Sequence, residues 1–385
     1  MSIVIRNGID RVDNIKKVVK GRRVGLVTNQ SGIDKNFNYT IDIFNQNFDL
    51  KVLYSPEHGI RGNLQAGEKL DHYRDEKTNI MVYSLYGKYR KPSSEMLNEI
   101  DVLVFDVGDV GSRYYTYLYT MAYCMEACKE NNKDFIVLDR VNILGGENVE
   151  GNILDTKYKS FVGLYPIPIR YGLTIGELAC LINEEFEIGC NLEVIKITGW
   201  KRDMYHDDTD LYWFNPSPNI PSLENALLYT GTCLFEGTNI SEGRGTTNPF
   251  EIVGAPWING YELANRLEEK DIPGVKFRPI YFTPTFSKYK DEVCEGVQIH
   301  ILDKTKVKSV EISLYLLNEI KKMDKGNFEY IKPFKRDMHY FIDYLSGSND
   351  IRKSLGKDDL VDELIKKWKE ESLQFKKTKE KYHIY

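Results

Sequence analysis

The sequence predicts an α/β fold: a Rossmann-like, doubly wound and mostly parallel sheet, followed by a smaller α+β C-terminal domain. Two observations lead to this prediction. Short apolar runs alternate with segments of helical spacing through the first half of the chain, which is typical of βαβ units. Prolines then interrupt this pattern between residues 216 and 221, and strand and helix patterns follow them in a different order.

Five apolar runs in the first half are predicted to be buried, mostly parallel strands. They cover residues 24–27, 51–54, 79–83, 102–105 and 135–138. The segments between several of these runs have the apolar spacing and polar flanks of helices that cover a sheet. These helices are expected over residues 39–47, 93–100 and 114–132, and a further helix is expected to begin near Thr174.

The proline-rich stretch is the best domain boundary, and we place the boundary near Ser222. Its prolines exclude a helix or a central strand over several residues. We therefore expect residues 1–222 to form the Rossmann-like domain and residues 223–385 to form the α+β domain that completes a cleft. Within the second domain we expect strands over 276–283 and 296–302, and helices over 307–322 and 358–381.

Composition and charge exclude several functional classes. The chain has 52 basic and 57 acidic residues spread along its length, so no basic face is available for nucleic acid. Its first twenty residues carry several charges, and no apolar run approaches the roughly 20 residues that span a bilayer. We expect no membrane partner and a cytoplasmic location, or a secreted one if a signal peptide was removed.

Metal and cofactor motifs are also missing from the sequence. The six cysteines form no C-x-x-C pair, and the six histidines are scattered without an H-E-x-x-H motif. The nucleotide-binding motifs G-x-G-x-x-G and G-x-x-x-x-G-K-[ST] do not occur, and neither does the G-x-S-x-G elbow of many serine hydrolases. We therefore expect neither a metal nor a cofactor.

Polar loops follow four of the predicted strands. They cover residues 28–32, 55–59, 106–109 and 139–140. In open α/β sheets the ligand crevice lies at the carboxyl ends of the strands, so we expect these loops to converge on a ligand. Glu57 is the best catalytic candidate among them, because it lies just past a strand between Pro56 and the pair His58-Gly59, a placement that exposes its side chain.

Carboxylates in such loops suit the hydrolysis of a sugar linkage. This reaction generally needs one carboxylic acid that protonates the leaving oxygen and a second group that assists at the anomeric carbon. Glu68 supplies a second acid in the same loop region as Glu57. The alternative is that Glu57 only caps a helix or forms a salt bridge.

Two further segments combine acids, glycines and an arginine. Residues 106–115 contain two aspartates, two glycines, Arg113 and two tyrosines. Residues 235–250 are rich in small and polar side chains and contain Glu236, Glu242 and Arg244, which suits hydrogen bonding to hydroxyls and to an anion. The alternative for the second segment is an ordered network of turns.

Together these segments resemble the exo-β-N-acetylmuramidase family, long known only as a domain of unknown function. The resemblance spans nearly the whole chain and rests on residues 25–29, 55–59, 66–68, 109–117, 139–140, 218–221 and 235–257. It implies an enzyme that releases terminal N-acetylmuramic acid (MurNAc) from the non-reducing end of peptidoglycan fragments, with its site in a cleft between two domains. One departure is that Val141 and Ile143 stand where the family usually has prolines.

Carried over to this chain, the resemblance implies Glu57 as the catalytic residue, with His58 and Glu68 as further catalytic candidates. The implied substrate-binding residues are Asn29, Asp109, Arg113, Tyr114, Asp139, Arg140, Asn219, Glu236, Asn239, Glu242 and Arg244. We expect Glu57 to act as general acid/base while a second carboxylate, or the acetamido group of the substrate, assists. Either Arg113 or Arg244 is expected to hold the lactyl carboxylate of muramic acid.

Two alternatives from other classes stay open at this point. One is a non-catalytic protein that binds muropeptides in the same cleft. The other is a nucleotide-sugar or nicotinamide enzyme, which the predicted sheet alone would allow.

Overall fold

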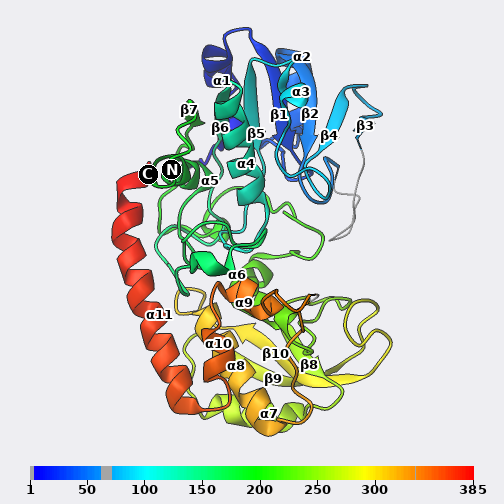
Figure 1. Ribbon diagram of the computed structural model, residues 1–385, viewed down its shortest axis with the longest axis vertical. Coiled ribbons are helices and arrows are strands. Elements are labelled where there is room, and N and C mark those ends of the chain that lie inside the picture. The colour runs from blue at the N-terminus through cyan, green and yellow to red at the C-terminus, as the bar shows by residue number, and fades with distance from the viewer. Residues whose placement is uncertain (1–3, 62–71, 334) are drawn as a thin grey trace.

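Two sheets lie at opposite ends of the molecule in the computed structural model, which describes residues 4–61, 72–333 and 335–385 (Figure 1). The larger sheet is mostly parallel and is formed by the first half of the chain, and the smaller one is antiparallel. The predicted α/β class, with a smaller sheet-containing C-terminal part, is thereby confirmed.

The order of strands in the larger sheet is β3-β4-β2-β1-β5-β6-β7, and all neighbours are parallel except β3 and β4. The strands are β1 (Arg23–Thr28), β2 (Asp49–Ser55), β3 (Tyr73–Arg74), β4 (Met81–Ser84), β5 (Val102–Asp106), β6 (Asp134–Leu138) and β7 (Leu192–Ile195). The five predicted strands are confirmed, and β3 and β7 extend the sheet at its edges. The chain runs outward from β1 to β2 and β4 and returns on the other side of β1 at β5, so its winding direction reverses between β1 and β5.

The predicted helices of this part are confirmed, although two of them are shorter than expected. The helices are α1 (Val12–Val19), α2 (Thr40–Asn47), α3 (Ser94–Leu97), α4 (Tyr117–Glu130) and α5 (Ile175–Glu185). Helix α5 begins where expected because the side chain of Thr174 accepts from the backbone N–H of Glu177, whose carboxylate accepts from Thr174 N–H in return. Residues 114–116 precede α4 rather than belonging to it, which leaves them available to a site.

The C-terminal part contains an antiparallel sheet of strand order β8-β10-β9. Its strands are β8 (Ile252–Ala255), β9 (Val275–Phe282) and β10 (Cys294–Ile301), and its helices are α6 (Leu223–Thr232), α7 (Gly260–Glu268), α8 (Ser309–Met323), α9 (Phe341–Ser346), α10 (Asp350–Ser354) and α11 (Asp358–Lys379). The two predicted strands and two predicted helices are confirmed within a few residues. Short 3-10 turns are η1 (Gly8–Asp10), η2 (Thr156–Tyr158), η3 (His206–Asp208), η4 (Cys233–Gly237) and η5 (Glu380–Tyr382).

One apolar core joins the two parts. Phe105 of β5, Phe235 of η4 and Leu317 of α8 belong to the same cluster of buried side chains. Helix α11 runs along one side of the molecule from the small sheet back to the large one, as Figure 1 shows in red. The loops between the two sheets are therefore attached to one continuous apolar core. No helix in the described residues is long and apolar enough to cross a membrane.

Candidate active site

A cavity of about 200 Å³ lies past the carboxyl ends of β2 and β4, where loops from both parts of the chain meet. Its polar lining residues are Glu57, His58, Thr116, Ser217, Asn219, Glu236 and Arg244. Much of the remaining wall is aromatic, with Tyr86, Tyr115 and Phe250 among the rings. Aromatic walls with a few well-placed polar groups are typical of pockets that bind small ligands.

Glu57 reaches this cavity through a sharp turn after β2. His58 and Gly59 have backbone φ angles of 72° and 78°, in the left-handed region that residues other than glycine adopt uncommonly. Such strain persists at functional sites when the surrounding structure fixes it, and His58 is held in a buried position here. The turn leaves Glu57 half-buried at the cavity wall.

Two hydroxyl groups orient the Glu57 carboxylate. Thr116 Oγ1 donates to Glu57 Oε2 at 2.9 Å, and the hydroxyl of Tyr86 also hydrogen-bonds to this carboxylate. Burial, together with the negative charge of Glu57, raises the pKa of Tyr86 to about 12, so Tyr86 keeps its proton and remains a donor. The carboxyl group of Glu57 is thus held in one orientation by residues from two different loops.

Arg244 lies in the wall contributed by the C-terminal part. Its Nη2 is 2.7 Å from Glu236 Oε1, and its Nε is 3.5 Å from Glu242 Oε1. Burial opposes the charge of Arg244, but these two carboxylates raise its pKa above the ordinary value and keep it protonated. Glu236 holds Nε and Nη2 of Arg244, whose side chain lines the cavity and is placed to meet a ligand there.

Glu242 supports Arg244 from behind the cavity wall. It is 2% exposed and accepts a hydrogen bond from Lys288 Nζ at 2.8 Å. Lys288 also donates to the backbone oxygens of Phe235 and Ile240, which fixes the loop before β8. These contacts confirm an ordered network of turns in residues 235–250, and Arg244 of that network lines the cavity.

A second, smaller hollow of about 70 Å³ lies at the carboxyl ends of β1, β5 and β6. We call it the switch-point crevice, because it lies beside the reversal between β1 and β5. Its lining includes Ser31, Asp34, Gly108, Asp109, Arg140, Tyr212 and Phe214. Burial raises the pKa of the Asp109 carboxyl to about 6, against hydrogen bonds from Tyr171 and from backbone N–H groups.

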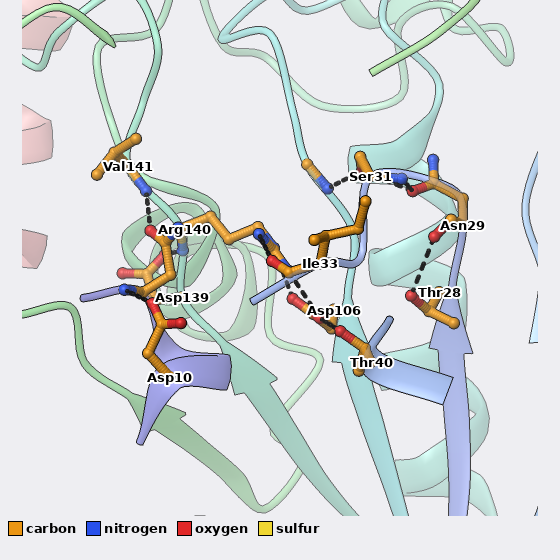
Figure 2. Close-up of polar contacts among 12 residues, drawn as sticks. Asp10, Thr28, Asn29, Ser31, Ile33, Thr40, Asp106, Asp139, Arg140 and Val141 are labelled. Carbon is orange, nitrogen blue, oxygen red and sulfur yellow. Dashed lines mark hydrogen bonds and ion pairs between the residues drawn. The ribbon is translucent and has the colours of Figure 1, made fainter. Parts of the chain in front are cut away.

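Figure 2 shows the polar network under this crevice. The Arg140 guanidinium forms two hydrogen bonds with Asp106, Nε to Oδ1 at 2.6 Å and Nη2 to Oδ2 at 2.8 Å. Arg140 also donates to the backbone oxygen of Ile33. The side chain of Asn29 accepts from the backbone N–H and the hydroxyl of Ser31. These contacts fasten the loops after β1, β5 and β6 to each other.

Two family models cover most of the chain. The model of the exo-β-N-acetylmuramidase NamZ N-terminal domain matches residues 24–224, and that of the C-terminal domain matches residues 227–385. The chain belongs to the exo-β-N-acetylmuramidase NamZ family. The family resemblance that the sequence motifs indicate is thereby confirmed.

Relatives of the NamZ family match over nearly the full length. The peptidoglycan β-N-acetylmuramidase NamZ of Bacillus subtilis (strain 168) is 47% identical over 384 residues, which are 99% of this chain and 91% of that protein. Two crystal structures of DUF1343 family proteins from Bacteroides fragilis NCTC 9343 are also similar. One has a TM-score of 0.91 at 39% identity and covers 100% of both chains, and the other has 0.77 at 30% and covers 99% of both.

The structure brings some of the residues implied by the NamZ family together and separates others. Glu57, His58, Tyr114, Asn219, Glu236 and Arg244 line the cavity. Asp109 and Arg140 line the switch-point crevice instead. Asn29, Arg113, Asp139, Asn239 and Glu242 line neither hollow, and Glu68 lies outside the described residues.

Arg113 does not face the cavity, contrary to one of the two expectations for the lactyl carboxylate. It is fully buried, and its guanidinium donates to the backbone oxygens of Asn152, Ile167, Leu345 and Ser346. Those oxygens come from both parts of the chain. Arg113 therefore ties the parts together, and Arg244 is the arginine that a cavity ligand can reach.

Asp139 and Asn239 also hold backbone segments in place. Asp139 accepts hydrogen bonds from Thr174 Oγ1, Gly176 N–H and the Tyr385 hydroxyl, and burial raises its pKa to about 7. The side chain of Asn239 donates to Asn327 O and accepts from Glu329 N–H. Asp139 and Asn239 thus fix the loops around them, and neither lines the cavity or the switch-point crevice.

Sequence reasoning missed several residues of the cavity. Tyr86 follows β4 in the same way that Glu57 follows β2, so the polar loop after that strand was the available signal. Thr116 gives no signal because the sequence pattern predicts a helix over residues 114–132, whereas α4 begins at Tyr117. Phe161 comes from a long segment without a periodic pattern and carried no signal. In the described ranges, no group of three or more His, Cys, Asp or Glu side chains is placed to hold a metal ion.

Proposed function

We propose that this chain is a glycoside hydrolase that releases terminal MurNAc from the non-reducing end of peptidoglycan fragments such as MurNAc-GlcNAc. The observation that carries the proposal is the Glu57 carboxylate, fixed by Thr116 and Tyr86 in an aromatic cavity that also contains Arg244. The name of the B. subtilis relative, a peptidoglycan β-N-acetylmuramidase, supports the substrate class. The cleft lies between an N-terminal domain of residues 1–222 and a C-terminal domain of residues 223–385.

Glu57 acts as general acid/base toward the glycosidic oxygen. Because two hydroxyls already hold its carboxylate in one orientation, less conformational freedom is lost when the transition state forms. General acid/base catalysis supplies about 10²- to 10⁴-fold, short of the roughly 10⁶-fold or more that enzymes reach. Other groups must therefore stabilise the oxocarbenium-like charge. His58, next to Glu57 in the cavity wall, stays a catalytic candidate.

Glu236 or the acetamido group of the substrate assists at the anomeric carbon. Glu236 supports the first alternative, because it is the cavity-lining carboxylate besides Glu57 among the described residues. Arg244 Nε and Nη2 both donate to Glu236 Oε1, which fixes the orientation of this carboxyl group beside the cavity. The anomeric configuration of the first product separates the mechanisms: inversion requires a carboxylate that activates water, whereas retention fits a covalent intermediate or acetamido participation.

Arg244 holds the lactyl carboxylate that distinguishes MurNAc from N-acetylglucosamine (GlcNAc). A guanidinium suits this task because its donors match a carboxylate in geometry. The aromatic rings of the wall pack against the apolar faces of the sugar.

The substitution Glu57→Gln tests this proposal against the exposed control Glu99→Gln. We expect turnover of an aryl β-N-acetylmuraminide to fall about 10²- to 10⁴-fold in the first variant and to stay unchanged in the second. Full turnover by Glu57→Gln contradicts the assignment. Release of free MurNAc from MurNAc-GlcNAc by the unmodified protein separates an enzyme from a muropeptide-binding protein, which would return the disaccharide intact.

A further inference from the structure

The rim of the switch-point crevice carries a group of three aromatic rings, two of which are largely exposed. Phe37 and Tyr212 are 55% and 58% exposed, and their ring centroids are 4.6 Å apart. Phe214 packs edge-on against Phe37 with centroids 5.6 Å apart. Contiguous exposed apolar surface is uncommon on soluble proteins and marks sites of interaction.

The loop that presents Phe37 is held by hydrogen bonds and contains one residue in a strained backbone conformation. Phe37 has a φ of 65°, in the left-handed region. The Asp34 carboxylate accepts from the backbone N–H groups of Asn36 and Asn38, and the N–H of Phe37 donates to Asp34 O. A glycine would relieve the strain, and a polar side chain would suit the exposure. The chain instead holds a phenyl ring out into solvent at a cost to stability, which points to a function.

Polar groups of the adjoining crevice are suited to bind hydroxyl or amide groups. Asp109 lines the crevice, and its Oδ1 is buried without a hydrogen-bond partner among the described residues. A buried acceptor without a donor costs free energy, and a sugar hydroxyl or an acetamido N–H would satisfy it. The crevice also lies at the reversal of winding direction, where open α/β sheets bind ligands.

The crevice and the cavity lie on the two sides of one short segment. Pro216 lines the crevice, and its neighbour Ser217 lines the cavity. The backbone oxygen of Pro216 accepts from Gln30 Nε2 at 2.9 Å and from the Tyr117 hydroxyl at 3.2 Å, so this segment is fixed. One fixed segment therefore separates the two hollows, and a sugar chain with its end in the cavity would pass over this segment to reach the crevice.

We propose that the switch-point crevice with the rim of Phe37, Tyr212 and Phe214 is a second saccharide subsite, which binds sugar residues of a glycan fragment remote from the bond that is cut. Sugar rings suit this surface because their C–H faces pack on aromatic rings while their hydroxyl and acetamido groups reach polar atoms beside them. The inference rests on the proposed function, because it takes the occupant of the cavity to be the end of the same glycan.

The test compares substrates of different length in a double variant, Phe37→Gly with Tyr212→Ala. Glycine suits the left-handed backbone at position 37, so the loop keeps its conformation while the ring is lost. We expect KM for fragments of four and six sugars to rise about 10-fold, with turnover of MurNAc-GlcNAc unchanged within about twofold. The control removes two other exposed rings, Tyr261→Ala with Tyr281→Ala, which lie on α7 and β9 away from both hollows.

Two outcomes would overturn the second subsite: an unchanged KM for the longer fragments, or the same loss on the disaccharide as on the hexasaccharide. An unchanged melting temperature of the double variant excludes unfolding as the cause of such a loss. Failure of the proposed function is a separate result, because the unmodified protein would then release no sugar from the disaccharide.

Discussion

At the scale of single residues, Arg113 and Arg244 have the same side chain in different surroundings. Arg113 is buried and donates to backbone oxygens, and desolvation lowers its pKa to about 10. Arg244 contacts Glu236 and lines the cavity. Substitutions at the two positions should therefore affect different properties of the protein.

For Arg244→Lys we expect a loss of substrate discrimination. Lysine keeps the charge that Glu236 and Glu242 require but loses the planar set of donors. Hydrogen bonds to charged groups contribute about 1.5 to 3 kcal/mol, so kcat/KM for an aryl muraminide should fall at least about 10-fold. The matching aryl glucosaminide should be nearly unaffected. Equal losses on both substrates would show that Arg244 does not read the lactyl group.

For Arg113→Met we expect a loss of stability without a change in discrimination. Methionine fills much of the same volume but removes the Arg113 donor from four buried carbonyl groups, of which Ile167 O keeps a hydrogen bond from Leu154 N–H at 3.4 Å. We expect the free energy of unfolding in urea to fall by about 3 to 5 kcal/mol. The ratio of muraminide to glucosaminide rates should stay as it is. A stable variant with an altered ratio would instead place Arg113 in the substrate site.

At the scale of elements, the sequence predicts which strands build the sheet and which loops leave it. Buried parallel strands are continuous apolar runs, and Glu57 follows one of them directly. The pattern does not predict which loops face the same hollow. Asp109 and Glu57 both follow strands but line different hollows, because β1 lies between β5 and β2. The role of Arg113 depends on carbonyl groups distant in sequence, which no local pattern encodes.

The carboxyl end of β6 gives a prediction about pH. Burial raises the pKa of Asp139 from 3.8 to about 7, so between these values the folded protein binds a proton that the unfolded chain has released. This group therefore contributes stability that declines as pH rises from about 4 to 7. In Asp139→Asn the decline should vanish. From pH 5 to pH 8, the unfolding free energy of Asp139→Asn should therefore rise by about 1 to 3 kcal/mol relative to that of the unmodified protein.

The matched control for Asp139→Asn is Asp203→Asn, which neutralises an aspartate near the surface. Urea unfolding at several pH values measures both variants. A parallel pH dependence of Asp139→Asn and the unmodified protein would mean that Asp139 is ionised throughout this range.

At the scale of the whole molecule, α11 fastens the C-terminal part to the large sheet. Ser372 donates to Gly151 O, Lys379 donates to the backbone oxygens of Gly146 and Gly172, and the Tyr385 hydroxyl reaches Asp139 and Ile197. The apolar core is continuous beneath these contacts. Because the core and these contacts are shared, we expect the two parts to unfold together. The cavity, whose walls come from both parts, depends on the same connection.

Lys379 makes this connection sensitive to pH. Burial lowers its pKa from 10.5 to about 8, so between these values the unfolded chain binds a proton that the folded protein lacks. Stability from this group therefore rises as pH increases from about 8 to 10.5. From pH 7.5 to pH 10, the unfolding free energy of the unmodified protein should therefore rise by about 1 to 3 kcal/mol relative to that of Lys379→Met. The exposed Lys377→Met, on the same helix, should show no such change. If both variants follow the unmodified protein in parallel, Lys379 is charged in the folded state, and its contacts with the two carbonyl groups are those of an ammonium ion.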